Sequence, residues 1–182
     1  MRLSAQQVYD KLINDDRILE IEGRITFDFG DVNITVKQKD VVGNIIQEWV
    51  QGWLDKNHIE YAPSENTQMP PDFFLNPDDL TQNLLEVKAF NRSASPGFDI
   101  ADFRAYQKEI VEHPYMLHAD YLIFGYDMDE NGIVQYSNNP VIVKGQKLLS
   151  ELPEKEGYAA INQEGYKIMA YRSSIGYVNA IA

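Results

Sequence analysis

The stretch PPDFFLNPDDLTQNLLEVKAF, residues 70–90, places charged groups inside a segment that otherwise has the pattern of a buried strand. Leu84–Phe90 is apolar except for Glu86 and Lys88. Because the side chains of a strand alternate between its two faces, these two charged residues share a face. Isolated buried charges are costly unless they are paired or bound to a metal ion. The stretch therefore predicts a strand with one face adapted to a charged function.

A second acidic residue, Asp72, begins the preceding predicted strand, Asp72–Leu75. Two carboxylates from adjacent strands and the backbone carbonyl between Glu86 and Lys88 would form an all-oxygen set of ligands, which Mg²⁺ prefers. Lys88 on the same face could steady a metal-activated water or a phosphate, which favours a phosphodiester-cleaving site. The competing interpretation is an ordinary salt bridge at a sheet edge with a turn aspartate nearby.

Hydrophobic periodicity and turn residues predict the elements around this stretch. The strongest are an amphipathic helix over 40–57, whose apolar stripe includes Trp49 and Trp53, and a central strand over 119–126. The other predicted elements are a helix over 5–13 capped by Ser4, a hairpin within 18–36 turning at Gly30-Asp31, a short strand over 59–62, a turn-rich loop over 91–97, a helix over 100–112 capped by Asp99, a turn over 127–132 leading into another strand, a short helix over 145–152, and β-like stretches over 158–161 and 166–172. This order indicates an α/β (α+β) domain with helices on both faces of one sheet.

Composition excludes several classes of protein. The 182-residue chain is 44% hydrophobic, which suits one globular domain, and its absence of cysteine excludes disulfides and thiolate metal sites. No stretch reads as a signal sequence or a membrane span, so a cytoplasmic protein without a membrane partner is expected. The net charge of −12 argues against a generally adhesive nucleic-acid binder but allows a local phosphate-facing surface.

Other metal motifs are weak. Residues 127–132 begin like an EF-hand loop, but the twelfth position is Asn138 and the flanks read as strands, so a hairpin turn is the better interpretation. His113 and His118 lack the spacing of a zinc pair on a helix. No glycine-rich phosphate loop is present, and no nucleotide cofactor is expected.

The sequence resembles the PD-(D/E)XK nuclease superfamily through Pro71-Asp72, thirteen intervening residues, and Glu86-Val87-Lys88. Over roughly residues 40 to 135 it resembles a type II restriction endonuclease of the NgoBV/NlaIV kind. The segments that carry this narrower resemblance are Val42-Gly43-Asn44, Ile59-Glu60-Tyr61, Pro71–Asn76, Leu84–Lys88, Ser95–Ala101 and Ala119–Tyr126. The last forty residues do not clearly follow the family pattern. The resemblance implies a restriction-endonuclease-like fold, with a central mixed β-sheet flanked by helices.

The organisation expected from this resemblance is a single nuclease domain over residues 1–182. Its core covers about 40–135, an N-terminal helix and hairpin cover 1–37, and a C-terminal β-rich extension covers 136–182.

The resemblance also implies Mg²⁺-dependent, site-specific hydrolysis of double-stranded DNA, by a homodimer. Asp72 and Glu86 would be metal ligands assisted by the Val87 carbonyl, and Lys88 would be the catalytic lysine. Such nucleases often add a glutamate from the preceding helix, where Glu48 is the only candidate, although its angle from the apolar stripe favours a solvated helix face. The expected DNA-binding residues are Arg92, Ser93, Ser95, Arg104 and Lys108.

Two other classes of function remain open at this point. One is a non-catalytic DNA-binding or repair protein that keeps the nuclease fold, and the other is an acidic protein-interaction domain. The intact set of Asp72, Glu86 and Lys88 favours the enzyme over the first of these alternatives.

Overall fold

A computed structural model describes residues 1–65, 69–93, 109, 111–136, 141–144, 159–161 and 168–170. Its helices are α1 (Ala5–Asp10), the π-helix η1 (Lys11–Asp15), the 3₁₀ helices η2 (Ile18–Glu20) and η3 (Pro114–His118), and α2 (Val41–Lys56). Its strands are β1 (Glu22–Arg24), β2 (Thr26–Phe29), β3 (Val32–Thr35), β4 (Ala62–Pro63), β5 (Phe73–Phe74), β6 (Leu84–Asn91), β7 (Asp120–Met128), β8 (Ile133–Gln135), β9 (Val141–Lys144), β10 (Ala159–Ile161) and β11 (Ile168–Ala170).

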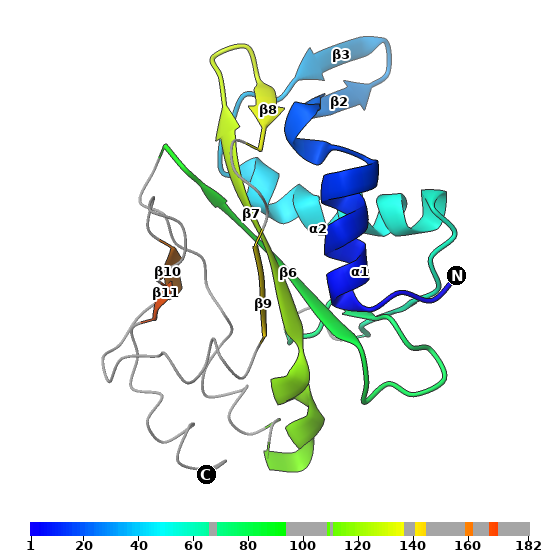
Figure 1. The fold of residues 1–182 in the computed structure, drawn as a ribbon. Helices are drawn as coiled ribbons and strands as arrows, with labels where there is room; N and C mark the ends of the chain where they lie inside the picture. Colours follow the sequence, from blue (N-terminus) through cyan, green and yellow to red (C-terminus); the bar gives the residue numbers. More distant parts are fainter. Residues whose placement is uncertain are drawn as a thin grey trace.

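A seven-stranded mixed sheet organises the described part of the chain (Figure 1). Its strand order is β1-β8-β7-β6-β5-β4, and β9 also pairs with β7. The central pair β6–β7 is parallel, whereas every other pairing in this sheet is antiparallel. The predicted mixed sheet is therefore confirmed, and its parallel centre is formed by the strands predicted over 84–90 and 119–126.

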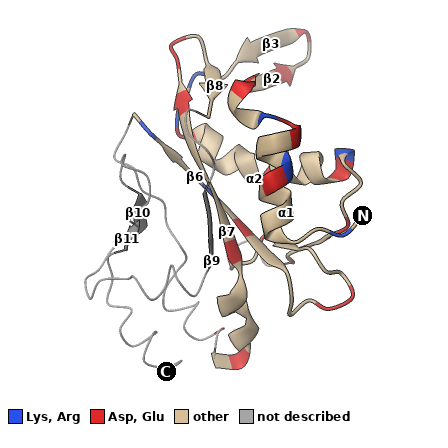
Figure 2. Ribbon diagram, in the orientation of Figure 1, with Lys and Arg blue, Asp and Glu red and all other residues tan. Residues whose placement is uncertain are grey.

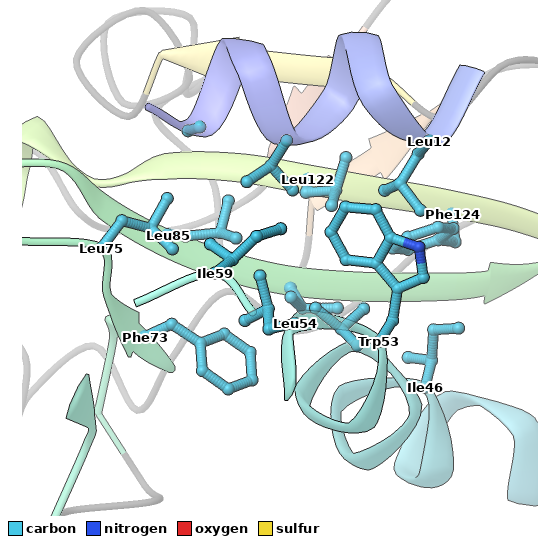
Figure 3. Packing of buried hydrophobic residues seen from close by; sticks show 14 of the residues in the cluster. Leu12, Ile46, Trp53, Leu54, Ile59, Phe73, Leu75, Leu85, Leu122 and Phe124 are labelled. Carbon is cyan, nitrogen blue, oxygen red and sulfur yellow. The ribbon is translucent and has the colours of Figure 1, made fainter. Parts of the chain in front are cut away.

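Both α-helices pack on the same face of β6 and β7 (Figures 1 and 3). Leu85 and Val87 of β6 alternate with Glu86 and Lys88, so the apolar residues of β6 meet the helices while the charged pair points to the other face. The core residues shared by helices and sheet are Val8, Leu12, Ile46, Val50, Trp53, Leu54, Leu85, Val87, Leu122 and Phe124. The helix predicted over 100–112 and the short helix over 145–152 lie almost wholly outside the described residues, so helices on the second face remain a prediction.

The start of the chain largely follows the sequence prediction. Ser4 caps α1 with a capping box, in which its side chain accepts a hydrogen bond from Gln7 N–H and the Gln7 side chain accepts one from Ser4 N–H. The α-helix ends at Asp10, earlier than predicted, and continues as η1 to Asp15. The hairpin turning at Gly30-Asp31 is confirmed as β2–β3, whereas β1 pairs with β8, more than 100 residues away.

The strand predicted at 59–62 is wrong over its first residues, because they complete the end of α2. His58 adopts a left-handed conformation, and Ile59 N–H donates to the Leu54 carbonyl at 3.0 Å. This hydrogen bond across the helix end, followed by a buried Ile59, is a helix-capping arrangement. The strand β4 begins only at Ala62.

The two tryptophans of α2 differ in their surroundings. Trp53 is buried, and its indole N–H donates to Asp16 Oδ2 at 2.7 Å. Trp49 is 42% exposed, so its predicted place in the core is wrong. Trp49 lines an apolar hollow of about 320 Å³ together with Ile21 and Ile25.

Within the described residues, no helix is both long enough and apolar enough to cross a membrane.

Candidate active site

The two candidate carboxylates lie opposite each other on neighbouring strands. Phe73 of β5 pairs with Leu85 of β6 in antiparallel register, and continuing this register by one residue places Asp72 opposite Glu86. Directly opposite residues of antiparallel strands have their side chains on the same face. The side chains of Asp72 and Glu86 are both buried, and Glu86 is only 3% exposed. The structure therefore brings together Asp72 and Glu86, as the sequence predicted.

Each carboxylate has a specific contact with the Glu86-Val87-Lys88 segment. Asp72 Oδ2 accepts a hydrogen bond from the backbone N–H of Val87 at 2.7 Å. Lys88 Nζ lies 2.7 Å from Glu86 Oε1, and the Lys88 side chain is 22% exposed. The lysine therefore reaches from the buried acid towards solvent, where a substrate phosphate could meet it.

The Val87 carbonyl lies on the Asp72 side of β6. In an antiparallel ladder, a hydrogen-bonded residue directs its N–H and its C=O to the same neighbour. Because the Val87 N–H points to Asp72, the carbonyl points to that side as well. β5 ends before this position, since its residues pair only with Leu85 and Leu84.

Burial dominates the electrostatics of the two acids. Burial raises the pKa of Glu86 to about 7, the Lys88 ammonium opposes this increase, and the nearby Asp72 charge adds to it. Burial also raises the pKa of Asp72, while the hydrogen bond from Val87 N–H and the charge of Lys88 lower it. Two buried acids whose pKa values are both raised by burial are stabilised in their charged forms by a bound cation.

The site has an acceptor that fits such a cation. Glu86 Oε2 is buried, and it has no hydrogen-bond partner among the described residues. No three histidine, aspartate or glutamate side chains converge in the part of the chain that the structure describes, so this cluster supplies two carboxylates. Mg²⁺ is usually held by one or two carboxylates with waters and substrate phosphate, so the donor set suits this ion.

Figure 2 marks charged residues on the helices and loops and also on the central strands β6 and β7. Glu48 is exposed on α2, which packs on the face of β6 opposite Glu86 and Lys88. This position agrees with a solvated helix face.

The described DNA-binding candidates lie where β6 ends. Arg92 is mostly buried, and its Nε lies 3.9 Å from Asp127 Oδ2. Ser93 is exposed, and its N–H and hydroxyl both donate to Asn91 Oδ1, at 2.9 and 2.7 Å. Ser95, Arg104 and Lys108 lie outside the described residues.

Two buried polar residues next to the site were not singled out in the sequence. Tyr121 of β7 is the parallel partner of Glu86, and its side chain is 1% exposed. Asp120 is the partner of Leu85 and is also buried. The sequence could have indicated both residues, because an aspartate and a tyrosine stand at the start of an otherwise largely apolar strand over 119–126.

The fold is that of a known class of protein, the restriction endonucleases. The solved structure of NlaIV restriction endonuclease is 52% identical to the chain and superposes with a TM-score of 0.78, over 95% of this chain and 70% of that one. The family model of the NgoBV restriction endonuclease matches residues 2–144. The chain belongs to the NgoBV restriction endonuclease family.

Two relatives share a long segment with the chain. The type II restriction enzyme NlaIV of Neisseria lactamica is 66% identical over 134 residues, which are 74% of this chain and 55% of the relative. The type II restriction enzyme NgoBV of Neisseria gonorrhoeae is 58% identical over 134 residues, which are 74% of this chain and 76% of the relative. The chain thus matches little more than half the length of the NlaIV enzyme.

Proposed function

We propose that the chain acts as a type II restriction endonuclease that hydrolyses phosphodiester bonds of double-stranded DNA at a specific sequence. The observation that supports this most directly is the meeting of Asp72, Glu86 and Lys88 at one edge of β6, in a chain of the NgoBV family. A structural salt bridge alone would not require a second buried acid whose charge raises the pKa of the first. The two relatives named above carry the same kind of activity in their names.

Mg²⁺ is the proposed cofactor, with Asp72, Glu86 and the Val87 carbonyl as its protein ligands. When bound, it would neutralise phosphate charge and lower the pKa of a coordinated water. The hydrogen bond from Val87 N–H holds the Asp72 carboxylate in a fixed orientation before DNA arrives. Glu86 is held by its ion pair with Lys88 in the same way.

Lys88 is the proposed catalytic lysine. Its ammonium group is paired with Glu86 at 2.7 Å, and its partial exposure leaves it accessible to a scissile phosphate. From this position it would donate a hydrogen bond to the attacking water or to a phosphate oxygen, which stabilises the charge that develops in the transition state.

The proposal includes a DNA-binding surface and a homodimer. Arg92 and Ser93 at the end of β6 would contact the backbone phosphates, together with Ser95, Arg104 and Lys108. Arg92 would exchange its 3.9 Å contact with Asp127 for charge-assisted hydrogen bonds to a phosphate. A cytoplasmic location completes the proposal.

The direct test is incubation of the purified protein with phage DNA and Mg²⁺, with Lys88→Ala as the matched control. Discrete fragments from the wild type and intact DNA from the variant are expected. Salt-dependent DNA binding without any cleavage in Mg²⁺ or Mn²⁺ would favour the non-catalytic alternative, and the absence of both would favour the acidic interaction protein.

A further inference from the structure

Gly125 of β7 leaves a gap on the sheet face that carries Glu86 and Lys88. It is the parallel partner of Phe90 in β6, and Phe90 lies two residues beyond Lys88, so Phe90 and Gly125 belong to that face. A Cβ on Gly125 would lie 2.9 Å from Phe90 Cζ and 3.1 Å from Arg92 Nη1. The Phe90 ring and the Arg92 guanidinium therefore both lie over the backbone of Gly125, in the space that a side chain would fill.

Arg92 follows the last residue of β6, and its backbone continues the ladder with β7. Its N–H donates to the Tyr126 carbonyl at 2.9 Å. Its side chain then lies over β7, with Nη1 above Gly125 and Nε 3.9 Å from Asp127 Oδ2, and it is only 19% exposed. A guanidinium held across a strand in this way has lost much of its rotational freedom before a ligand arrives. Less entropy is then lost when the ligand binds.

The cations of the two central strands lie in one row along β6. β7 contains neither lysine nor arginine, and β6 contains only Lys88, with Arg92 directly after its end. Lys88 and Arg92 are four residues apart, which is roughly 13 Å along a strand. A DNA strand advances only about 3.4 Å along the helix axis for each phosphate, so the two cations would meet different phosphates of one backbone.

We infer that Gly125 is a positioning residue for DNA binding, because the space above it holds Arg92 on the face of Lys88 and so aligns a DNA backbone along β6. This inference rests on the proposed function, in which Lys88 faces the scissile phosphate, and Arg92 would then hold a further phosphate of the same strand. Gly125 itself contacts no DNA in this arrangement. A side chain at position 125 would displace the guanidinium but leave its charge in the protein, which separates positioning from net charge.

The competing interpretation is that Gly125 only makes room for the Phe90 ring in the core. Phe90 is buried, and its Cζ is the atom closest to the position of the absent Cβ. The two atoms that a Cβ would crowd belong to different side chains, however, so they can be removed separately. Phe90→Leu removes the tip of the ring, and Arg92→Ala removes the guanidinium.

The test is the affinity for a fluorescent DNA duplex of arbitrary sequence, measured by anisotropy in a chelator, since phosphate contacts do not depend on sequence. Gly125→Ala is expected to weaken binding by the same factor as Arg92→Ala. Each change should also reduce the slope of log K against log salt concentration by about 0.9, the value for one lost phosphate contact. Gly23→Ala is the matched control and should change neither quantity, because a Cβ on this strand glycine would lie an unstrained 3.9 Å from the Val134 carbonyl oxygen.

A double-mutant cycle shows whether Gly125 acts through Arg92. In the Arg92→Ala background, Gly125→Ala should change the affinity by less than about twofold, because the group that it displaces is already absent. An equal loss of affinity in both backgrounds would overturn the inference, and so would a Gly125→Ala protein that binds DNA like the wild type. If Gly125→Ala does not fold, the same cycle is measured in Phe90→Leu, where the closest atom is gone and the Cβ still lies 3.1 Å from the position of Arg92 Nη1.

The binding measurement does not depend on nuclease activity. A protein that binds DNA with the expected coupling between Gly125 and Arg92, but never cuts it in Mg²⁺, would retain this inference and remove the proposed function. A protein that cuts DNA, with a Gly125→Ala variant that binds like the wild type, would do the opposite. A protein that binds no DNA would remove both.

Discussion

Asp72 accepts a hydrogen bond from the backbone N–H of Val87, so the carboxylate proposed to hold the metal also ends the ladder between β5 and β6. The strand β5 is only two residues long, and beyond Leu85 its place beside β6 is taken by this side chain. A backbone N–H that is buried without a partner is costly, so Asp72 has a structural role as well as its proposed catalytic one. The structural role needs an oxygen that accepts a hydrogen bond, whereas the proposed metal-binding role needs a negative charge. Substitutions can therefore separate the two roles.

Two substitutions of Asp72 should separate these roles. Asp72→Asn keeps an oxygen that can accept the Val87 N–H but removes the negative charge, so cleavage should fall by at least 100-fold with little loss of stability. Asp72→Ala also leaves the Val87 N–H without its partner, which should lower the free energy of unfolding by a further amount of about 1–3 kcal/mol. Urea unfolding in the presence of a chelator and a plasmid-cleavage assay measure the two effects. If Asp72→Asn cleaves as well as the wild type, the carboxylate does not hold the metal.

Substitution of Lys88 should abolish cleavage while the fold is retained. Lys88→Ala removes the ammonium group that lies 2.7 Å from Glu86, and the isolated Glu86 would then remain protonated to higher pH, since Lys88 is what opposes the effect of burial. Because the acid can become neutral, the melting temperature should change by only a few degrees. Single-turnover cleavage should fall by roughly 10²–10⁴-fold, the usual contribution of a positioned acid–base group.

Preserved cleavage in Lys88→Ala, together with a large fall in its melting temperature, would contradict the catalytic role of Lys88. Glu86 and Lys88 would then be a structural ion pair, whose disruption leaves an uncompensated buried charge and costs about 3–5 kcal/mol. Lys11→Ala is a useful control, because Lys11 makes an ion pair with Asp16 at 3.5 Å and lies on η1, outside the candidate site.

The sequence predicted the centre of the fold because the local pattern there agrees with the tertiary packing. In β6, Leu85 and Val87 alternate with the charged pair, and in α2, Ile46 and Trp53 form an apolar stripe. Each of these patterns can be recognised from a few neighbouring residues of the sequence. The pairing of β1 with β8 depends on segments more than 100 residues apart, and a sequence pattern contains no information on such a contact.

The candidate site was predictable in its residue types but not in its internal contacts. Asp72 and Glu86 could be placed on adjacent strands because each falls in a strand predicted from the local pattern. The hydrogen bond to Val87 N–H could not, because it arises only where β5 stops, and the end of a two-residue strand has no signature of its own. The exposure of Trp49 was missed for a similar reason: helical periodicity shows which face is apolar but not how much of it is covered.

Stability in the absence of metal should fall as the pH rises from about 4.5 to about 7. The pKa of Glu86 is raised from 4.5 to about 7 by folding, so the folded protein binds a proton that the unfolded chain releases over this range. The folded state therefore loses about 3 kcal/mol from this group by the time the pH exceeds 7, at about 1.4 kcal/mol for each pKa unit. Glu86→Gln has no such proton to lose.

The measurement is urea unfolding at pH 5 and pH 8 in chelator, for the wild type and Glu86→Gln. The difference in the free energy of unfolding between the two pH values should be smaller in the variant. Equal pH dependence in the two proteins would mean that Glu86 keeps an ordinary pKa, and that its burial does not control its charge.

Mg²⁺ should bind in exchange for the Glu86 proton, and cleavage should depend on that ion. Because the carboxyl must be ionised to hold the metal, binding at pH 6 should release a proton and binding at pH 8.5 should not. Titration calorimetry in two buffers of different ionisation enthalpy measures this release, and the pH 6 signal should disappear in Glu86→Gln. Cleavage should require Mg²⁺ or Mn²⁺, while Ca²⁺, which accepts looser geometry, should support DNA binding without efficient turnover. Full cleavage in a chelator, or the same buffer dependence at both pH values, would remove Glu86 from the metal site.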